Sequence, residues 1–390
     1  MERLIIFLSQ HYEMLIPSVV FVSFFASRQA YRLIHFIGIS KKLFSQPNSR
    51  SSHFAPVPQF GGVGLYFATC ITASVFVALL VFHDFGGHLE KVYKPGGVLA
   101  FISGLTIIFY TGFVDDLIDM KALLKFLFQV VSVAIVMLPT NGFINHFFGI
   151  FGLEEISTAL AIPFTFFVYL LVINAFNLID GIDGLASSLG IIGSLFFGVY
   201  FTSIERYDLV ILNFSLLGAL GGFLISNFSK TKKLFLGDSG SMVVGLCMAF
   251  QSVQFLTLNP IFEESSPMSH APVYVLSIVA YPLIDVMRVI ISRLLRNKSP
   301  FLPDRNHIHH KLLDLGFSHV KATALIVAYT SVLLLLTYLT SELNIHLHLI
   351  VMTITAVSLA LVPVNIHKIR SKSKIAVKTI KKQPSVLKAS

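Results

Sequence analysis

The chain has 390 residues, of which 55% are hydrophobic and 13% charged, and its formal net charge is +9. A soluble domain carries about 25% charged residues, so this composition excludes an ordinary soluble fold, and the apolar stretches lack the alternation of a transmembrane β-barrel. We therefore predict an all-α, polytopic membrane protein. We attribute its positive charge to membrane topology and not to a nucleic-acid partner.

About eleven apolar segments are long enough to cross a hydrocarbon core of roughly 30 Å. Lysine and arginine gather in alternate connections and in the tail, so the positive-inside rule places the N-terminus outside and the C-terminus inside. We predict one membrane domain over residues 1–365 and a basic, disordered cytoplasmic tail over residues 366–390. The spans are expected near residues 12–34, 61–83, 97–114, 122–139, 160–177, 185–203, 208–228, 240–258, 272–292, 319–340 and 346–364.

A polar entrance precedes the second span. Residues 48–53 are rich in serine, and residues 56–62 hold prolines and glycines. The prolines fix an extended chain, and the glycines permit a tight turn at the membrane. The predicted topology places this entrance on the cytoplasmic side, together with each of the four clusters that follow.

The first cluster is a pair of aspartates at the end of the third span. Asp115 and Asp116 are followed by Asp119 and, one turn beyond Lys121, by Lys125. Adjacent carboxylates raise each other's pKa unless a cation lies between them. The D-D-x-x-D pattern also resembles the magnesium-diphosphate motif of prenyl-transferring enzymes. A solvated helix end remains the simpler alternative.

The second cluster interrupts the apolar sequence between the fifth and sixth spans. Asn174, Asn177, Asp180 and Asp183 stand there with two glycines. Polar groups at a membrane boundary are costly and mark a functional site. Their oxygen atoms are hard ligands that suit Mg²⁺, and glycine allows a ligand to approach the backbone. We therefore expect the chemistry to lie here.

Two further clusters carry an acid and a group of histidines. Asp238 follows Phe235 and a glycine at the start of the eighth span, where a simple helix N-cap is the alternative. Residues 299–311 hold Arg305 with His307, His309 and His310. The histidine spacing lacks the usual helical zinc pair. An anion clamp fits better because arginine binds phosphate through two hydrogen bonds, although a plain basic loop remains open.

Four motifs occur in a fixed order along the chain. The D-D pair, N-x-x-N-x-x-D-G-x-D-G-L, F-x-G-D-S-G-S and P-D-R-x-H-I-H-H resemble those of the polyprenyl-phosphate N-acetylhexosamine-1-phosphate transferases, over about residues 45–330. The His-Ile-His-His form is most similar to the undecaprenyl-phosphate N-acetylglucosaminyl-1-phosphate transferases. The resemblance implies a single membrane transferase domain.

The resemblance also implies site residues, each at a matching position. The catalytic group would comprise Asp115, Asp116, Lys125, Asp180 and His307. Magnesium would be held by Asn177 and Asp238. The substrates would be bound by Gly181 and Asp183 at the uridine, Phe235 against the uracil ring, and the loop residues Arg305, His309 and His310.

The implied reaction transfers a phospho-N-acetylhexosamine, GlcNAc 1-phosphate as the leading choice, from a UDP-sugar to undecaprenyl phosphate. UMP would be released, and the lipid product would start a cell-envelope glycan such as O-antigen. The enzyme would lie in a bacterial inner membrane, in contact with membrane lipid, with its site facing the cytoplasm. Mg²⁺ is the implied cofactor, with Mn²⁺ as the alternative, and a homodimer is left open. A membrane prenyltransferase and an anion transporter are the rival functions.

Overall fold

Helices form all the regular structure in the described part of the chain. The computed structural model describes residues 12–41, 57–82, 95–140, 142–262, 268, 270–299 and 306–381. An isolated β-bridge joins His146 to Glu155 there. The predicted all-α class is therefore confirmed. The helices are α2 (Tyr12–Ser40), α3 (Gly61–Phe82), α5 (Pro95–Ile118), α6 (Ala122–Met137), the short 3₁₀ helix η2 (Ile150–Gly152), α7 (Thr158–Ile179), α8 (Leu185–Ser203), α9 (Tyr207–Asn227), α10 (Gly237–Leu258), α11 (Ala271–Leu294), α12 (Ile308–Asp314), α13 (His319–Leu339) and α14 (Ile345–Lys381).

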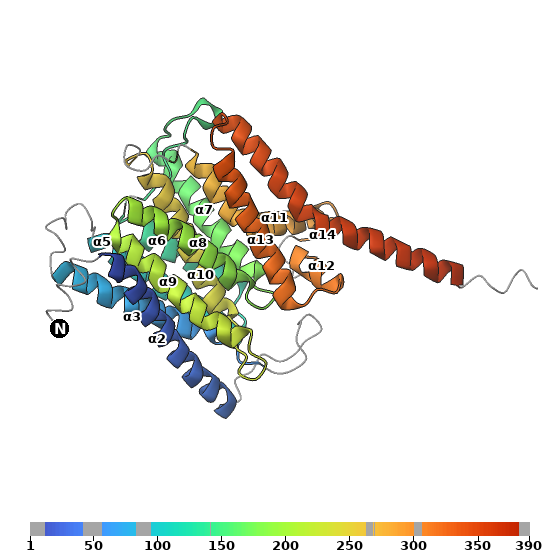
Figure 1. The fold of residues 1–390 in the computed structure, drawn as a ribbon, viewed down its shortest axis with the longest axis horizontal. Coiled ribbons are helices and arrows are strands. Elements are labelled where there is room, and N and C mark those ends of the chain that lie inside the picture. Colours follow the sequence, from blue (N-terminus) through green and yellow to red (C-terminus); the bar gives the residue numbers. More distant parts are fainter. Residues whose placement is uncertain are drawn as a thin grey trace, which may run out of the picture.

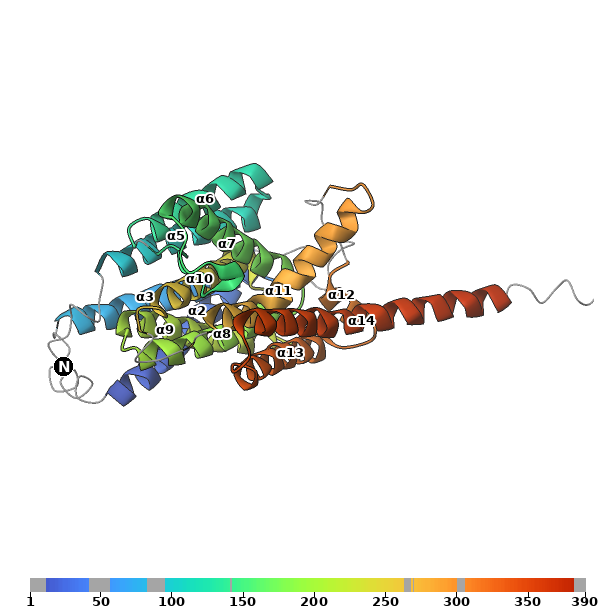
Figure 2. The same ribbon diagram turned by 90° about the horizontal axis from the view of Figure 1, so that it is seen from above.

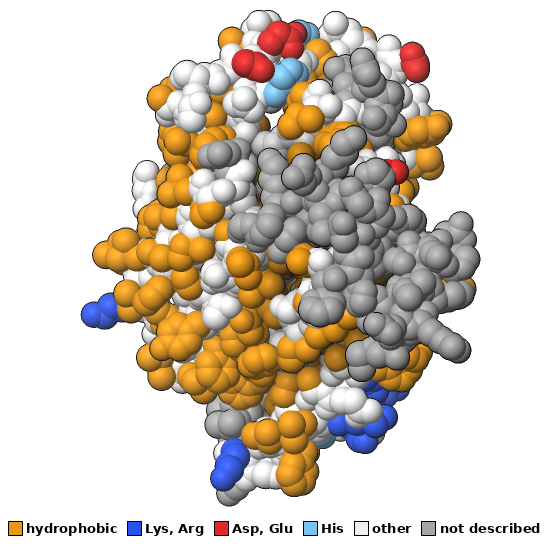
Figure 3. Space-filling view, turned by 90° about the vertical axis from the view of Figure 1, so that its left-hand side faces the viewer, with side chains coloured by type: hydrophobic (Ala, Val, Ile, Leu, Met, Phe, Trp, Pro, Cys, Tyr) orange, Lys and Arg blue, Asp and Glu red, His pale blue; other side chains and the backbone are white. Residues whose placement is uncertain are grey.

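A helix occupies each of the eleven predicted spans. Nine helices in the described residues are long and apolar enough to cross a membrane. The other two are α6, which has 16 residues, and α2, which carries Arg28 and Arg32 in its second half. Figure 3 shows a broad hydrophobic surface with acidic side chains at one end and most lysines and arginines at the other. The chain is thus an integral membrane protein, and its sidedness stays a prediction.

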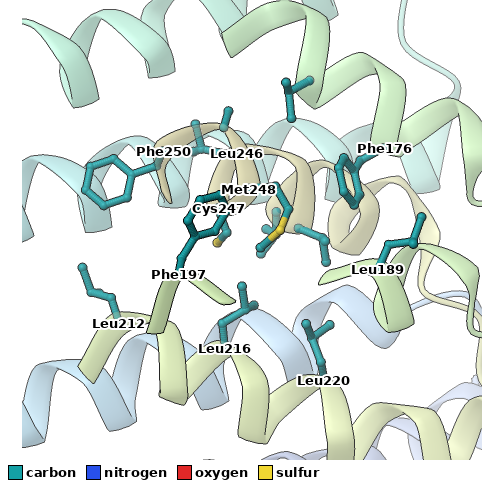
Figure 4. Close-up of a cluster of buried hydrophobic side chains, with 14 of the residues drawn as sticks. Phe176, Leu189, Phe197, Leu212, Leu216, Leu220, Leu246, Cys247, Met248 and Phe250 are labelled. Atoms are coloured by element: carbon teal, nitrogen blue, oxygen red, sulfur yellow. The ribbon is translucent and has the colours of Figure 1, made fainter. Parts of the chain in front are cut away.

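Helix α10 forms the centre of the bundle (Figure 1). Of its most apolar 18-residue window, 94% is buried, the largest share among the nine helices. Figure 4 shows Leu246, Met248 and Phe250 of α10 among side chains from α7, α8 and α9. Helices suit this setting because their backbone groups are satisfied internally, where lipid offers no hydrogen bonds.

The helix ends that carry the polar clusters meet at one end of the bundle. There α5 ends and α6 begins, α7 ends and α8 begins, and α10 begins after the end of α9. At the opposite end, the backbone N–H of Phe151 donates to His346 Nε2 at 3.1 Å and joins η2 to the start of α14. The alternating direction of the spans therefore brings together residues that lie far apart in sequence.

Helix α14 continues beyond the bundle as a single long element (Figure 2). Residues 366–381 were expected to belong to a disordered tail, whereas the helix runs to Lys381. Lysine, alanine and isoleucine are good to moderate helix formers, and the first proline after this stretch is Pro384. Local helix propensity thus accounts for the difference.

Candidate active site

A lysine ammonium and three oxygen atoms that accept its hydrogen bonds form the centre of the site. Lys125, near the start of α6, places Nζ 2.8 Å from Asp115 Oδ2 and 3.4 Å from Asn177 Oδ1. The same ammonium donates to Asp238 Oδ2 in the first turn of α10. Asn177 donates from Nδ2 to Ser241 Oγ at 2.9 Å, which turns its carbonyl oxygen toward the lysine. Four helices therefore deliver these groups to one point.

The same three oxygen atoms could also coordinate a divalent cation. Two carboxylate oxygens and one amide oxygen converge around the position of the Lys125 ammonium. Hard oxygen ligands of this kind suit Mg²⁺, which binds through a few protein oxygens and keeps several waters. The predicted ligands Asn177 and Asp238 are thus adjacent, and Asp115 joins them. Their role in metal binding stays a prediction.

Asp116 lies beside Asp115 in sequence but faces the start of α10. Its Oδ1 accepts a hydrogen bond from the backbone N–H of Asp238 at 2.8 Å. Its Oδ2 accepts from the backbone N–H and the hydroxyl of Ser239, at 3.1 and 2.7 Å. A carboxylate at a helix N-terminus satisfies unpaired N–H groups and complements the helix dipole. Asp116 therefore fixes the helix that carries Asp238.

The third aspartate of the D-D-x-x-D pattern lies apart from the pair. Asp119 is exposed and has a positive φ of 50°. Its N–H donates to the Asp115 carbonyl at 3.1 Å, and the N–H of Met120 donates to Asp115 Oδ1 at 2.6 Å. Aspartate tolerates this left-handed conformation, so Asp119 closes the turn between α5 and α6. This placement weakens the prenyltransferase alternative.

The loop between α7 and α8 is held from two sides. Asp183 Oδ2 accepts from Lys233 Nζ at 2.7 Å and lies 3.2 Å from His319 Nδ1. Its backbone carbonyl accepts from the Thr323 hydroxyl at 2.7 Å. Burial alone would raise the pKa of Asp183, but the hydrogen bonds from His319 and Lys233 outweigh it and lower that pKa. Asp183 is therefore ionised and fixed at neutral pH.

Asp180 has the opposite electrostatic character. Burial raises the pKa of its carboxyl group well above the usual range, and the neighbouring carboxylates of Asp238, Asp116 and Asp183 raise it further. A site with this excess of carboxylates favours a proton or an additional cation at Asp180. The sequence placed Asp180 within the motif, and the structure brings it within electrostatic reach of the metal-ligand candidate Asp238.

Phe235 lies at the polar entrance. Its backbone N–H donates to the Pro58 carbonyl at 2.9 Å, and the N–H of Gly61 donates to the Phe235 carbonyl at 2.9 Å. Lys233 Nζ stands 5.4 Å from the centre of the Phe235 ring while it contacts Asp183. The predicted uracil and uridine residues therefore lie together. The earlier entrance residues 48–56 lie outside the described part of the chain.

The histidine loop is anchored by an aspartate within α11. Asp285 Oδ1 accepts from the backbone N–H of Ile308 at 2.7 Å. Its Oδ2 lies 3.2 Å from His307 Nδ1 and 3.3 Å from His309 Nδ1. The three ligand atoms lie within 4.8 Å of one another, a spacing that a metal ion could also bridge. His307 and His309 are both buried.

The histidine loop touches the α7–α8 loop through His309. A Cβ added at Gly181 would lie 2.5 Å from His309 Nε2, so only glycine permits this approach. Burial lowers the pKa of His309 despite the nearby Asp285 carboxylate. The ring of His310 lies 4.4 Å from that of His309. The histidines thus adjoin the α7–α8 loop.

Twelve of the thirteen predicted site residues lie in described segments, and their contacts join them into one assembly. Arg305 lies outside the described residues. The sequence did not single out Asp285, Lys233 or His319 as site residues. An aspartate within a long apolar span was itself a signal for Asp285, because ionisable groups in membrane helices are rarely structural accidents. The partners of Lys233 and His319 appear only after folding.

Comparison with known proteins gives a family match over part of the chain. The sequence profile described as Glycosyl transferase family 4 matches residues 98–256, which run from α5 to the end of α10. These residues include both aspartates of the pair, Lys125, the α7–α8 loop and Asp238. They do not include the histidine loop.

Curated relatives match more of the chain. The decaprenyl-phosphate N-acetylglucosaminephosphotransferase of Mycolicibacterium smegmatis is 28% identical over 316 residues, which cover 74% of this chain and 72% of that protein. The undecaprenyl-phosphate alpha-N-acetylglucosaminyl 1-phosphate transferase of Escherichia coli O157:H7 is 29% identical over 304 residues, which cover 76% of each. The resemblance that the motifs indicate is therefore confirmed.

Proposed function

We propose, from the similarity of the chain to the polyprenyl-phosphate N-acetylglucosamine-1-phosphate transferases, that it transfers GlcNAc 1-phosphate from UDP-GlcNAc to a polyprenyl phosphate. The observation that carries the proposal is the meeting of Lys125, Asp115, Asn177 and Asp238 at one end of the bundle. Relatives named for this transfer match about three quarters of the chain. The enzyme is thus a phosphoglycosyltransferase.

The reaction joins two phosphates without a change of oxidation state. An oxygen of the lipid phosphate attacks the β-phosphorus of the UDP-sugar, and the bond from that phosphorus to the bridging oxygen breaks. UMP leaves with the electron pair. A phosphate monoester has a second pKa near 6, so it is largely dianionic at pH 7. Direct attack therefore needs no strong general base, and the protein chiefly positions and neutralises the phosphates.

Lys125 supplies a positive charge beside Asp115 and Asp238. Its ammonium can neutralise a phosphate oxygen while Asp115 restrains its position. Asn177 and Asp238 would hold Mg²⁺ with Asp115, and a bound ion would offset charge on the diphosphate. Asp116 keeps α10 in register with α5, because it binds the helix start that carries Asp238.

The nucleotide is assigned to the side of the site near Phe235. The ring of Phe235 offers a face for stacking the uracil, and Asp183, held by Lys233, offers a carboxylate to the uridine. His307 and His310 belong to the histidine loop, which meets the α7–α8 loop where His309 lies against Gly181. We assign the diphosphate and the lipid phosphate to this part of the site, because they need cationic or donor groups.

The membrane setting fits a lipid acceptor. The site lies at the helix ends, where a polyprenyl phosphate can keep its chain in the bilayer and its phosphate in water. We place the protein in a bacterial inner membrane with the site facing the cytoplasm, where lysine and arginine gather in the connections. A midplane transport path receives no support, because the clusters meet at one end.

Purified protein in nanodiscs tests the function directly. Incubation with Mg²⁺, undecaprenyl phosphate and labelled UDP-GlcNAc should give UMP and a lipid-diphospho-GlcNAc, identified by mass spectrometry. Chelation of the metal should abolish both products. A panel of other UDP-N-acetylhexosamines would show the sugar preference. Intact nucleotide and no lipid product with every sugar would contradict the proposal.

An exchange experiment distinguishes direct attack from a covalent aspartyl-phosphate intermediate. Exchange of labelled UMP into UDP-GlcNAc without lipid would indicate an aspartyl-phosphate intermediate, which needs only the sugar nucleotide. Direct attack predicts no exchange until the lipid phosphate is present. We favour direct attack because Asp116 is engaged by α10 and Asp115 by Lys125, so neither carboxylate is free to act as a nucleophile without rearrangement.

A further inference from the structure

A buried carboxylate lies within membrane helix α11, outside every motif that indicated the function. Asp285 has 0% exposed side-chain surface. Apolar side chains surround it in sequence, from Ile284 to Val286. A buried ionised carboxylate is costly unless it accepts several hydrogen bonds. Its partners therefore indicate why an aspartate is present.

In the described part of the chain, all but one of the polar partners of Asp285 belong to the histidine loop. The backbone N–H of Ile308 donates to Oδ1, while Oδ2 faces Nδ1 of both His307 and His309. The exception is Arg288, one turn along α11, whose Nη2 lies 3.7 Å from Oδ1. One carboxylate thus hydrogen-bonds the start of α12 and the ring of His307, and it lies beside the ring of His309.

We propose that Asp285 is a positioning residue that orients His307 and His309 for the phosphates of the substrates, an inference that rests on the proposed function. With Nδ1 directed at the carboxylate, the ring of His307 presents Nε2 on its opposite edge. A carboxylate partner also selects the tautomer with the proton on Nδ1. His309 Nδ1 lies 3.3 Å from the same Oδ2, and the Nε2 on the opposite edge of its ring lies against Gly181 of the α7–α8 loop.

These contacts explain why loss of the Asp285 carboxylate would lower turnover although Asp285 itself does not touch the substrates in this proposal. Asn at position 285 keeps the size of the side chain, but its amide can accept on one atom only and presents a donor to the imidazoles. The rings would then turn or lose a partner. A misplacement of about 1 Å in an active site can cost on the order of 10²-fold in rate. We expect kcat of Asp285→Asn to fall by about that factor.

A double-mutant cycle separates positioning from general loss of structure. Asp285→Asn, His307→Gln and the double variant are assayed for UMP release, with Asp314→Asn as the matched control. Asp314 is 52% exposed on α12, so the same chemical change there should leave kcat unchanged. If Asp285 acts through His307, the double variant loses no more than the worse single variant. Losses that multiply would overturn the inference.

Imidazole nitrogen signals provide a test that needs no activity. In protein labelled with ¹⁵N-histidine, the signals absent from His307→Gln identify the ring of His307. Asp285→Asn should shift these signals toward the other tautomer, and unchanged signals would overturn the inference. If wild-type protein releases no UMP, the proposed function fails, while the signals still decide the positioning role.

A second variant covers the case of misfolding, and a measurement of metal content tests whether the cluster binds zinc instead. Should Asp285→Asn not fold, Asp285→Glu keeps the charge and moves the carboxylate by one methylene, and both readouts are repeated with it. Metal content of the purified protein is measured as well. One zinc ion per chain that is lost in the Asp285 variants would overturn the inference, because the cluster would then be a metal site.

Discussion

At the residue scale, two adjacent aspartates have different partners. Successive residues on an α-helix point about 100° apart, so adjacent side chains leave the helix in different directions. Asp115 faces Lys125, and Asp116 faces the backbone of Asp238 and Ser239. The sequence predicted one catalytic pair because it shows the two carboxyl groups without the helix that Asp116 binds. Both roles in catalysis stay predictions.

Substitution of each aspartate by asparagine should show that Asp115 and Asp116 differ in their effect on stability. Asp116→Asn removes one of the two oxygens that accept hydrogen bonds from the start of α10, and a buried donor left without a partner costs about 1–3 kcal/mol, so the protein should unfold at a lower temperature as well as lose turnover. Asp115→Asn should lose turnover with a smaller change in unfolding temperature, since Asp115 pairs with a partly exposed lysine. Thermal unfolding in detergent and UMP release measure both effects. Equal unfolding temperatures would contradict the assignment.

Asp183 makes a pH-dependent contribution to stability. Its pKa is lowered in the folded protein by His319 and Lys233, against the effect of burial, while the unfolded value is about 3.9. The folded state then binds fewer protons, so the stabilisation is present above the unfolded pKa and is lost as pH falls through the folded pKa. Between pH 6 and pH 3.5, the unfolding temperature of Asp183→Asn should fall less than that of the wild type. Parallel curves would refute this.

At the element scale, the start of α10 organises the site. The segment from Phe235 pairs with the entrance at Pro58 and Gly61, and the first turn of α10 carries Asp238. Gly237 has a positive φ of 73°, and a Cβ there would lie 2.6 Å from Asp116 Oδ2. The glycine before Asp238 is therefore required by conformation and by space.

Gly237→Ala should displace the start of α10. Left-handed backbone costs an alanine about 1–2 kcal/mol, and the clash with Asp116 adds to this strain. We expect a lower unfolding temperature and a loss of turnover. Gly152→Ala is the matched control: its φ is 74°, no atom lies within 4 Å of the added Cβ, and it lies in η2 at the opposite end of the bundle. Equal turnover in the two variants would exclude a role for the close contact.

Hydropathy was enough to predict each long helix, because a membrane span must satisfy its own backbone and present apolar side chains. It did not predict α12, which has seven residues and no span-length apolar run. It also did not identify Asp285, whose partners in the histidine loop are 22 and more residues away, at the start of that short helix. Local pattern predicts elements, whereas these contacts depend on how the elements pack.

At the scale of the whole molecule, alternating helix direction explains why the motifs meet. An apolar span reverses the side on which the chain emerges, so motifs separated by an even number of spans share a face. The Asp115 pair, the α7–α8 loop and Asp238 satisfy this condition, and their contacts join at one end. The sequence could therefore predict a common face. It could not predict which donor faces which, because helix rotation depends on side-chain packing.

The sidedness of that common face can be tested with single cysteines. The native Cys70 and Cys247 are both buried, so they should contribute little background. Thr231 is exposed at the site end of α9, and Ser157 is exposed at the opposite end, before α7. A membrane-impermeant thiol reagent on intact cells should label Ser157→Cys and not Thr231→Cys, and inverted vesicles should reverse the result. Labelling of Thr231→Cys from outside would place the site away from its nucleotide substrate, and so would contradict both the topology and the function.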